Sequence, residues 1–297
     1  MPNLLIRATL GACVLVVVIA AVAIALASSG AGNRQTDRGA PPTLRPRPAA
    51  PVRSIRRQVA AAVDHAQTVI DDPSSSVREL GSAALVEQLA ARRLAGETRA
   101  ERRATLGLLA SRARSSTSAN LAAAAALSTI ATRPRNLPRW RIVEPPPPDT
   151  LRGYFERAQE RSGVPWQYLA AIEFIETRFG RVDGISTAGA QGPMQFLPAT
   201  WARYGNGSVH NPRDAILGAA RYLVANGAPG HMTNAVYAYN NSVGYVRAVK
   251  DYAESMHADP RAYYGYYYWQ VIYDRASGAV ILPLGYPQTR PVPLSKR

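Results

Sequence analysis

Two glutamates three residues apart, Glu173 and Glu176, are the first candidates for chemistry in this sequence. The residues around them have helical spacing. On a helical wheel, one apolar stripe is formed by Tyr168, Leu169, Ile172, Ile175 and Phe179. Glu176 falls inside this stripe and Glu173 lies at its margin. Because burial disfavours the charged form of a carboxyl group, the pattern predicts a raised pKa for Glu176.

A buried carboxylic acid of this kind has two possible roles. A glutamate that keeps its proton near neutral pH can protonate a glycosidic oxygen as the sugar leaves. Alternatively, the side chain is structural and bonds to amides of the loop that follows. An ordinary glycosidase also needs a second carboxylate, as nucleophile or as base for water. Glu173 and Asp183 are the candidates, and their spacing does not choose between them.

The elements that must position Glu176 are short helices joined by a glycine-rich loop. The helix with the two glutamates is expected to begin near Pro165 and to end at Gly180, and the loop covers residues 183–192. Further helices are expected over residues 149–161, 211–226, 233–240 and 242–256. Strand-like residues 268–273 and 279–282 predict a C-terminal β-hairpin that either packs on the helices or offers aromatic faces to sugar rings.

The first half of the chain shows no catalytic pattern. Residues 28–53 are rich in proline and arginine and read as a spacer. Residues 54–132 are rich in alanine and arginine and predict a small helical bundle or a semi-ordered stalk. Its candidate helices are residues 55–70, 97–114 and 119–131, and a helix that the serine run 74–76 caps and that continues to about residue 94. A proline-rich linker, 133–148, separates this region from a second domain, 149–258, and an aromatic tail, 259–297.

The N-terminus predicts export. Residues 8–27 form an uncharged apolar run of about the length that crosses a bilayer, so residues 1–27 are either a signal anchor or a signal peptide cleaved after Ala27. Both alternatives place the rest of the chain outside the cytoplasm, attached to the cell membrane or secreted to the cell wall or periplasm. Nucleic acid is therefore not expected as a partner.

Cysteine and histidine usage excludes several kinds of site. Cys13 is the only cysteine and lies inside the apolar run, so the exported part has no disulfide and no thiol catalysis. The four histidines lack paired ligand spacing, which argues against zinc. Neither a metal nor another cofactor is expected.

The positive charge of the chain is uneven. The chain has 35 Lys+Arg against 20 Asp+Glu. Residues 28–148 hold 19 arginines and 9 acids, whereas residues 149–258 hold 10 cations and 9 acids. A basic flank suggests an anionic neighbour such as lipid headgroups or an acidic wall polymer, although a solvated arginine-rich surface explains it as well.

Three short motifs in residues 149–258 occur together and in order. They are AIEFIET at 171–177, GAQGPMQFLPATW at 189–201 and AVYAYNNSVGYV at 235–246. Together they resemble the soluble lytic transglycosylase domain of the lysozyme superfamily, whose enzymes cut the glycan of bacterial peptidoglycan. Two positions depart from the family pattern, since Thr177 replaces a serine and Pro193 replaces a leucine.

The resemblance implies a mainly α, lysozyme-like catalytic domain with Glu176 as its single catalytic residue. Glu176 would protonate the β-1,4 bond between N-acetylmuramic acid and N-acetylglucosamine. It would then deprotonate the muramoyl 6-hydroxyl, which closes a 1,6-anhydro ring. Tyr239 would lie close to Glu176 and orient it or the sugar. The remaining substrate-binding residues that the resemblance implies are Met194, Gln195, Asn240, Gln191 and Ser186.

Two other functions stay open from the sequence. A lysozyme-type hydrolase of the same fold would use Asp183 or Glu173 to position water. A non-catalytic protein would bind glycan or act as a scaffold in the cell wall. The expected partners are peptidoglycan strands, the cytoplasmic membrane through the N-terminal helix, and anionic wall polymers or wall-synthesis proteins.

Overall fold

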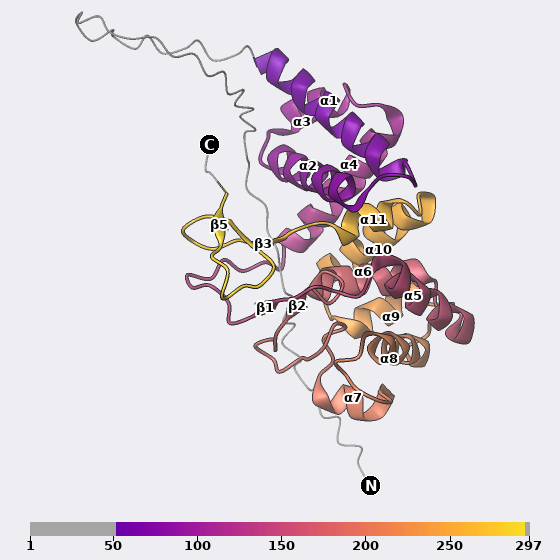
Figure 1. Ribbon diagram of the computed structural model, residues 1–297. Coiled ribbons are helices and arrows are strands. Elements are labelled where there is room, and N and C mark those ends of the chain that lie inside the picture. Colours follow the sequence, from indigo (N-terminus) through magenta and orange to yellow (C-terminus); the bar gives the residue numbers. More distant parts are fainter. Residues whose placement is uncertain (1–51, 295–297) are drawn as a thin grey trace, which may run out of the picture.

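The computed structural model describes residues 52–294, and these form eleven helices and five short strands (Figure 1). The expected membrane segment, residues 8–27, and nearly all of the expected spacer lie outside this range. None of the helices formed by residues 52–294 has the length and apolar character of a membrane span.

Four helices form a bundle at the start of the described chain. They are α1 Val52–Asp71, α2 Val77–Ala95, α3 Arg99–Leu106 and α4 Ser111–Ser128. Ser76 begins α2 with a capping box, in which its hydroxyl accepts from the backbone N–H of Glu79 and the Glu79 carboxylate accepts from Ser76 N–H. This start agrees with the sequence prediction.

The prediction of single helices over residues 97–114 and 119–131 was wrong. The chain breaks after α3 because Gly107 ends that helix and the Asp64 carboxylate of α1 accepts a hydrogen bond from Ala110 N–H. The Arg114 guanidinium closes the turn by donating to the carbonyl of Leu106 at 2.9 Å. The distant contact from α1, which local spacing does not reveal, decides where α4 begins.

The bundle packs directly on the second half of the chain. Helix α4 lies along α10 Val243–Ala258, and α1 and α2 contact α11 Ala262–Tyr267. In Figure 1, α10 and α11 lie between the bundle and the remaining helices. The contact includes a buried ion pair between Arg92 and Asp274 at 2.8 Å. Glu87 of α2 also accepts from the indole N–H of Trp269 at 2.9 Å.

Helix α6 Trp166–Thr177 carries both glutamates, and the second half of the chain has four other helices besides α10 and α11. They are α5 Pro148–Ser162, α7 Pro198–Tyr204, α8 Pro212–Ala225 and α9 Met232–Tyr239. Helix α6 contacts α5, α8, α10 and α11, so ten of its twelve residues are buried. The single apolar stripe expected from the wheel was therefore wrong, because a helix buried among other helices has apolar residues all around it. Glu173, which was expected at the margin of the stripe, is fully buried.

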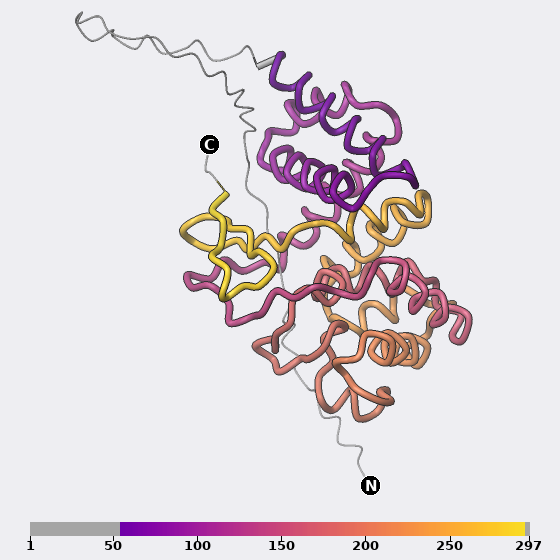
Figure 2. Tube along the Cα trace, viewed as in Figure 1, coloured from indigo at the N-terminus to yellow at the C-terminus, as the bar shows by residue number. Residues whose placement is uncertain are grey.

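The strands form two small antiparallel sheets. Strand β1 Arg141–Ile142 pairs with β2 Val182–Asp183, and β3 Val271–Tyr273, β4 Val280–Leu282 and β5 Val292–Pro293 form the second sheet. The hairpin of β3 and β4 was predicted, whereas β5, β1 and β2 were not. Figure 2 shows the C-terminal strands beside residues 133–147, and Ile142 N–H donates to the Tyr286 carbonyl at 3.0 Å. The fold is mainly helical with a small C-terminal sheet.

The tyrosine-rich segment before the hairpin forms α11, which was not predicted. Tyr263, Tyr266 and Tyr267 are buried in the main core. Tyr263 and Phe179 contact each other edge to face, with ring centroids 5.3 Å apart. These rings therefore stabilise the end of α6 from inside the core.

Candidate active site

The end of α6 is fixed by a tight turn. Arg178, Phe179 and Gly180 all have positive φ angles, so α6 stops at Thr177 and not at Gly180 as expected. The Thr177 hydroxyl donates to the Pro193 carbonyl at 2.6 Å and accepts from Gly180 N–H at 2.9 Å. Two hydrogen bonds from one side chain thus hold the glycine-rich loop against the helix, one residue after Glu176.

Glu176 lies in the last turn of α6, with its side chain pointing into a groove. The residue is 4% exposed. Its carboxylate accepts a hydrogen bond from the Tyr245 hydroxyl of α10 at 2.7 Å. Burial raises the pKa of Glu176 to about 7, and the Tyr245 hydrogen bond opposes part of this rise. The group therefore exchanges its proton near neutral pH.

The loop after α6 forms one wall of the groove. Its backbone folds back on itself, since Gln191 and Phe196 exchange two backbone hydrogen bonds of 2.9 Å. Gly192 sits between them with a φ of 73°, where a Cβ would collide with the Val209 carbonyl. Gln195 adopts a left-handed φ of 51°, and its side-chain amide donates to the Gly192 carbonyl at 2.9 Å. Glycine at 192 is therefore required for this compact turn.

The end of α9 forms the opposite wall. The Tyr239 hydroxyl crosses to the loop and donates to the Met194 carbonyl at 2.6 Å. Its ring contacts the Phe196 ring with centroids 6.1 Å apart. Asn240 follows, and its side-chain oxygen is buried without a hydrogen-bond partner in the described chain. The Tyr239 hydrogen bond thus joins the two walls, and the Asn240 side-chain oxygen remains able to accept a hydrogen bond.

The groove has a volume of about 120 Å³. The residues that line it are Glu176, Ser186, Ala188, Ala190, Gln195, Phe196, Leu197, Thr200, Tyr222, Ala238, Tyr239, Asn240 and Asn241. Glu176 is the sole carboxylate of this lining. No group of three or more His, Cys, Asp or Glu residues in the range 52–294 is placed to hold a metal ion.

Comparison with known proteins assigns the region around the groove. Residues 153–261 match the family described as "Transglycosylase SLT domain", and every residue that lines the groove lies in this range. This chain contains an SLT domain. No solved structure matches the chain.

The chain is also similar to two curated relatives. It is 29% identical over 168 residues to "Membrane-bound lytic murein transglycosylase F" of Thiobacillus denitrificans, covering 54% of this chain and 33% of the relative. It is 29% identical over 131 residues to "Membrane-bound lytic murein transglycosylase F 1" of Alkalilimnicola ehrlichii, covering 41% and 25%. The chain thus spans a third or less of the length of these relatives.

The SLT domain brings together five of the residues that the sequence singled out. Glu176, Ser186, Gln195, Tyr239 and Asn240 all line the groove. Ser186 also shapes the loop, because its hydroxyl accepts from Ala190 N–H at 3.0 Å.

Three residues that the sequence singled out lie outside the groove lining or have a different partner. The Met194 side chain is fully buried in the main core, and Met194 does not line the groove. Gln191 contributes backbone hydrogen bonds, and it is not among the groove-lining residues. The Tyr239 hydroxyl donates to the Met194 carbonyl and not to Glu176, whose hydrogen-bond donor is Tyr245.

Neither candidate for a second carboxylate reaches the groove. Glu173 is fully buried, and both of its carboxylate oxygens lack a hydrogen-bond partner within residues 52–294. Burial raises the pKa of Glu173 to about 8. Asp183 lies on β2, where its carboxylate pairs with the Arg141 guanidinium of β1 and lines a different pocket.

Sequence reasoning missed several residues of the SLT domain site. Tyr245 bonds to Glu176, and Thr200, Tyr222 and Asn241 line the groove. Tyr245 follows the helix-capping Ser242 by three residues and belongs to the third motif. A buried position on α10 could have been expected from the apolar spacing of that helix, but its pairing with Glu176 depends on how α6 and α10 pack.

Proposed function

We propose that this protein is a lytic transglycosylase that cleaves the MurNAc–GlcNAc β-1,4 bond of peptidoglycan with Glu176 as both acid and base. The observation that carries the proposal is a single carboxylate, buried and with a pKa of about 7, in the groove of an SLT domain. Both relatives are named lytic murein transglycosylases, which agrees with this substrate and reaction.

In the first step Glu176 acts as the general acid. The protonated carboxyl group donates its proton to the glycosidic oxygen, and the bond from that oxygen to the anomeric carbon of the muramoyl residue breaks. Burial favours the neutral carboxylic acid before the step. The Tyr245 hydroxyl then stabilises the carboxylate that forms, because it donates a hydrogen bond of 2.7 Å to it.

In the second step the same carboxylate acts as the base. It takes the proton of the muramoyl 6-hydroxyl while that oxygen attacks the anomeric carbon. The products are a 1,6-anhydro muramoyl end and a free hydroxyl on the leaving sugar, and Glu176 regains its proton. Because the nucleophile belongs to the substrate, the reaction needs no second carboxylate. This agrees with a groove lining that offers only Glu176.

The polar residues around Glu176 would hold the sugar. Asn240 offers a buried side-chain oxygen without a partner among the described residues, which suits the N–H of an acetamido group. Gln195 and Ser186 lie on the loop wall, across from Asn240 and Asn241. Tyr239 would hold the loop wall in place, because its hydroxyl donates a hydrogen bond to the Met194 carbonyl at 2.6 Å.

A hydrolase of the same fold is the less supported alternative. It would require a carboxylate that positions water opposite Glu176. Glu173 is fully buried in the core, and Asp183 pairs with Arg141 outside the groove, so neither is placed to position that water. A non-catalytic glycan binder is also disfavoured, since a buried acid costs stability without improving sugar binding.

We also propose that the protein is exported from the cytoplasm. Residues 1–27 would anchor the chain in the cytoplasmic membrane or be removed after Ala27. The words "membrane-bound" in the names of both relatives agree with the anchored form. The SLT domain would then act on the wall outside the cytoplasm, next to anionic wall polymers or wall-synthesis proteins.

The test compares full-length wild type with Glu176→Gln on purified peptidoglycan sacculi. Cleavage should fall on the order of 10²–10⁴-fold while sacculus binding is retained. Asp183→Asn is the matched control, because it removes a carboxylate outside the groove, and it should cleave normally. Full cleavage by Glu176→Gln would refute the catalytic assignment. Equal inactivity and equal binding of wild type and variant would favour the glycan-binding alternative.

A further inference from the structure

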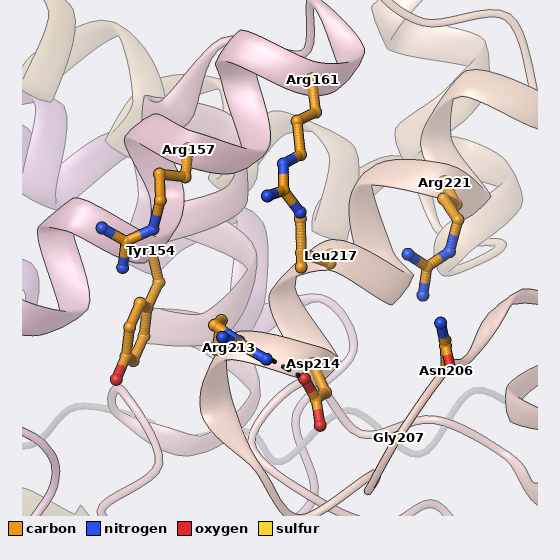
Figure 3. A pocket seen from close by; sticks show the side chains of 9 residues that line it. All are labelled: Tyr154, Arg157, Arg161, Asn206, Gly207, Arg213, Asp214, Leu217 and Arg221. Carbon is orange, nitrogen blue, oxygen red and sulfur yellow. Dashed lines mark ion pairs between the residues drawn. The ribbon is translucent and has the colours of Figure 1, made fainter.

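A second pocket lies between α5 and α8, outside the Glu176 groove. Its volume is about 410 Å³. The residues that line it are Tyr154, Arg157, Arg161, Asn206, Gly207, Arg213, Asp214, Leu217 and Arg221. Figure 3 shows Arg161 reaching from α5 toward Leu217 of α8, while Arg221 extends toward Asn206. None of these residues lines the groove, so the two pockets are separate.

The lining is strongly basic because of the helical spacing of its arginines. Arg157 and Arg161 are four residues apart on α5, and Arg213 and Arg221 are eight apart on α8. Each pair therefore lies on one face of its helix. Asp214 is the one acid of the lining, so the pocket carries four positive charges and one negative charge.

Most of the guanidinium donors are not used inside the protein. Asp214 pairs with Arg213 at 3.6 Å, and Arg221 donates to the Tyr204 carbonyl at 2.7 Å. Arg157 lies over the Tyr154 ring at 5.1 Å. Within residues 52–294, no hydrogen bond, ion pair or ring contact involves the Arg161 side chain. Each guanidinium has five N–H donors, so many donors remain free for an anion.

Phosphate fits this arrangement better than a carboxylate does. Several guanidinium groups can share the oxygens of one phosphate, each in a forked geometry. The volume of about 410 Å³ exceeds what a bare ion needs and falls in the range of small-ligand pockets. The Asn206 amide adds a neutral group that can bond to hydroxyls. A phosphate attached to a sugar or polyol matches both the charge and the size.

A bilayer surface fits less well. The lining contains none of the described chain's exposed large hydrophobic residues, and its one aliphatic side chain, Leu217, is partly buried. Membrane-binding surfaces usually add exposed apolar side chains to their basic residues. A pocket lined by exposed arginines without exposed apolar neighbours instead suits a discrete charged group on a soluble or wall-attached polymer.

We propose that the α5–α8 pocket binds a sugar phosphate or polyol phosphate unit of a phosphate-bearing polymer. The pocket and the groove share helix α8, since Arg221 lines the pocket and the next residue, Tyr222, lines the groove. Tyr204 connects the two sites, because its carbonyl binds Arg221 and its ring contacts Tyr222 with centroids 5.0 Å apart. A polymer bound in the pocket would keep the Glu176 groove close to the structure that carries the polymer.

The test uses full-length protein in a non-ionic detergent and a short glycerol phosphate oligomer as the probe. Binding is measured by calorimetry for wild type and for the double variant Arg157→Gln/Arg161→Gln. The charge-matched control is Arg99→Gln/Arg103→Gln, which removes two exposed arginines with the same spacing from α3. The pocket variant should bind at least about tenfold more weakly, whereas the control should bind as wild type does.

Three competitors and vesicles with anionic lipids separate the possible ligands. Inorganic phosphate should compete weakly, and free glycerol and an acidic dipeptide should not compete. Equal weakening in both double variants would show that surface charge alone is responsible and would overturn the proposal. Equal competition by the acidic dipeptide would also overturn it, as would binding only to vesicles with anionic lipids. Thermal unfolding of both variants checks that they are folded.

Discussion

The Tyr245 hydroxyl lies 2.7 Å from a carboxylate oxygen of Glu176, although the two residues are 69 positions apart in the chain. Burial and this hydrogen bond act on the pKa of Glu176 in opposite directions. Burial favours the protonated acid, and the hydroxyl favours the carboxylate. The two effects together give Glu176 a pKa at which it can donate a proton and accept it again near neutral pH.

The pH dependence of cleavage should reflect the protonation of Glu176. The group must start as an acid, and its pKa is about 7. Cleavage should therefore be fast below this pH and fall as the pH rises through about 7. The measurement is kcat/KM on a soluble glycan across neutral pH. A rate that rises through this interval would contradict the assigned protonation state.

Tyr245→Phe should change both the rate and this pH dependence. The substitution removes a hydrogen bond that favours the carboxylate, so the pKa of Glu176 rises and the alkaline fall moves to higher pH. The rate should drop about tenfold, because a hydrogen bond to a charged group contributes roughly 1.5 kcal/mol or more.

Tyr237→Phe is the control for Tyr245→Phe, since Tyr237 is exposed on α9 and does not line the groove. It should leave the rate and the profile unchanged. A Tyr245→Phe enzyme with the wild-type pH profile would show that Tyr245 has only a packing role.

Glu173 should make the protein less stable as the pH rises. Its pKa is about 8 in the folded protein, against 4.5 for a free side chain. Below about pH 4.5 Glu173 is protonated in both the folded and the unfolded protein and does not lower the free energy of unfolding. As the pH rises from there to about 8, the unfolded protein loses this proton first, so the free energy of unfolding falls. The loss is on the order of a few kcal/mol.

Glu173→Gln removes this titration and should flatten the curve by that amount. Urea unfolding of wild type and variant across the same pH interval measures the difference. Parallel curves for the two proteins would mean that Glu173 is not a buried neutral acid.

Thr177 should be needed for its hydroxyl and not for its methyl group. Thr177→Val leaves the Pro193 carbonyl and Gly180 N–H without their partner. It should lower the free energy of unfolding by about 2 kcal/mol or more and slow cleavage, because Glu176 is the preceding residue. Thr177→Ser keeps the hydroxyl and should behave as wild type in urea unfolding and in cleavage. Equal losses in both variants would point to the methyl group instead.

The sequence predicted features that depend on neighbours along the chain. Ser76, Asn211 and Ser242 each begin a helix as expected, because a capping side chain bonds within three residues of itself. The hairpin of β3 and β4 was also predicted, from two strand-like runs close together in the chain. Glu176 was chosen for its place on an apolar face, and burial raises its pKa as that reasoning required.

The sequence could not predict features that depend on packing. Glu173 was expected at the margin of the apolar stripe, but α5, α8, α10 and α11 all pack against α6. Glu173 therefore became a core residue and not a groove residue. Tyr239 lines the groove, yet its hydroxyl donates to the Met194 carbonyl, 45 positions earlier, and the hydrogen-bond donor of Glu176 is Tyr245. Such pairings are decided by helix packing, which spacing within one helix does not encode.

The central claim is that one glutamate cleaves the glycan with the substrate's own hydroxyl as nucleophile. The most direct test is digestion of sacculi in water labelled with heavy oxygen, followed by mass spectrometry of the new glycan ends. We predict 1,6-anhydro ends that carry no label, and their loss in Glu176→Gln. Reducing ends that contain the heavy oxygen would contradict the account, because they would show that water attacks the anomeric carbon.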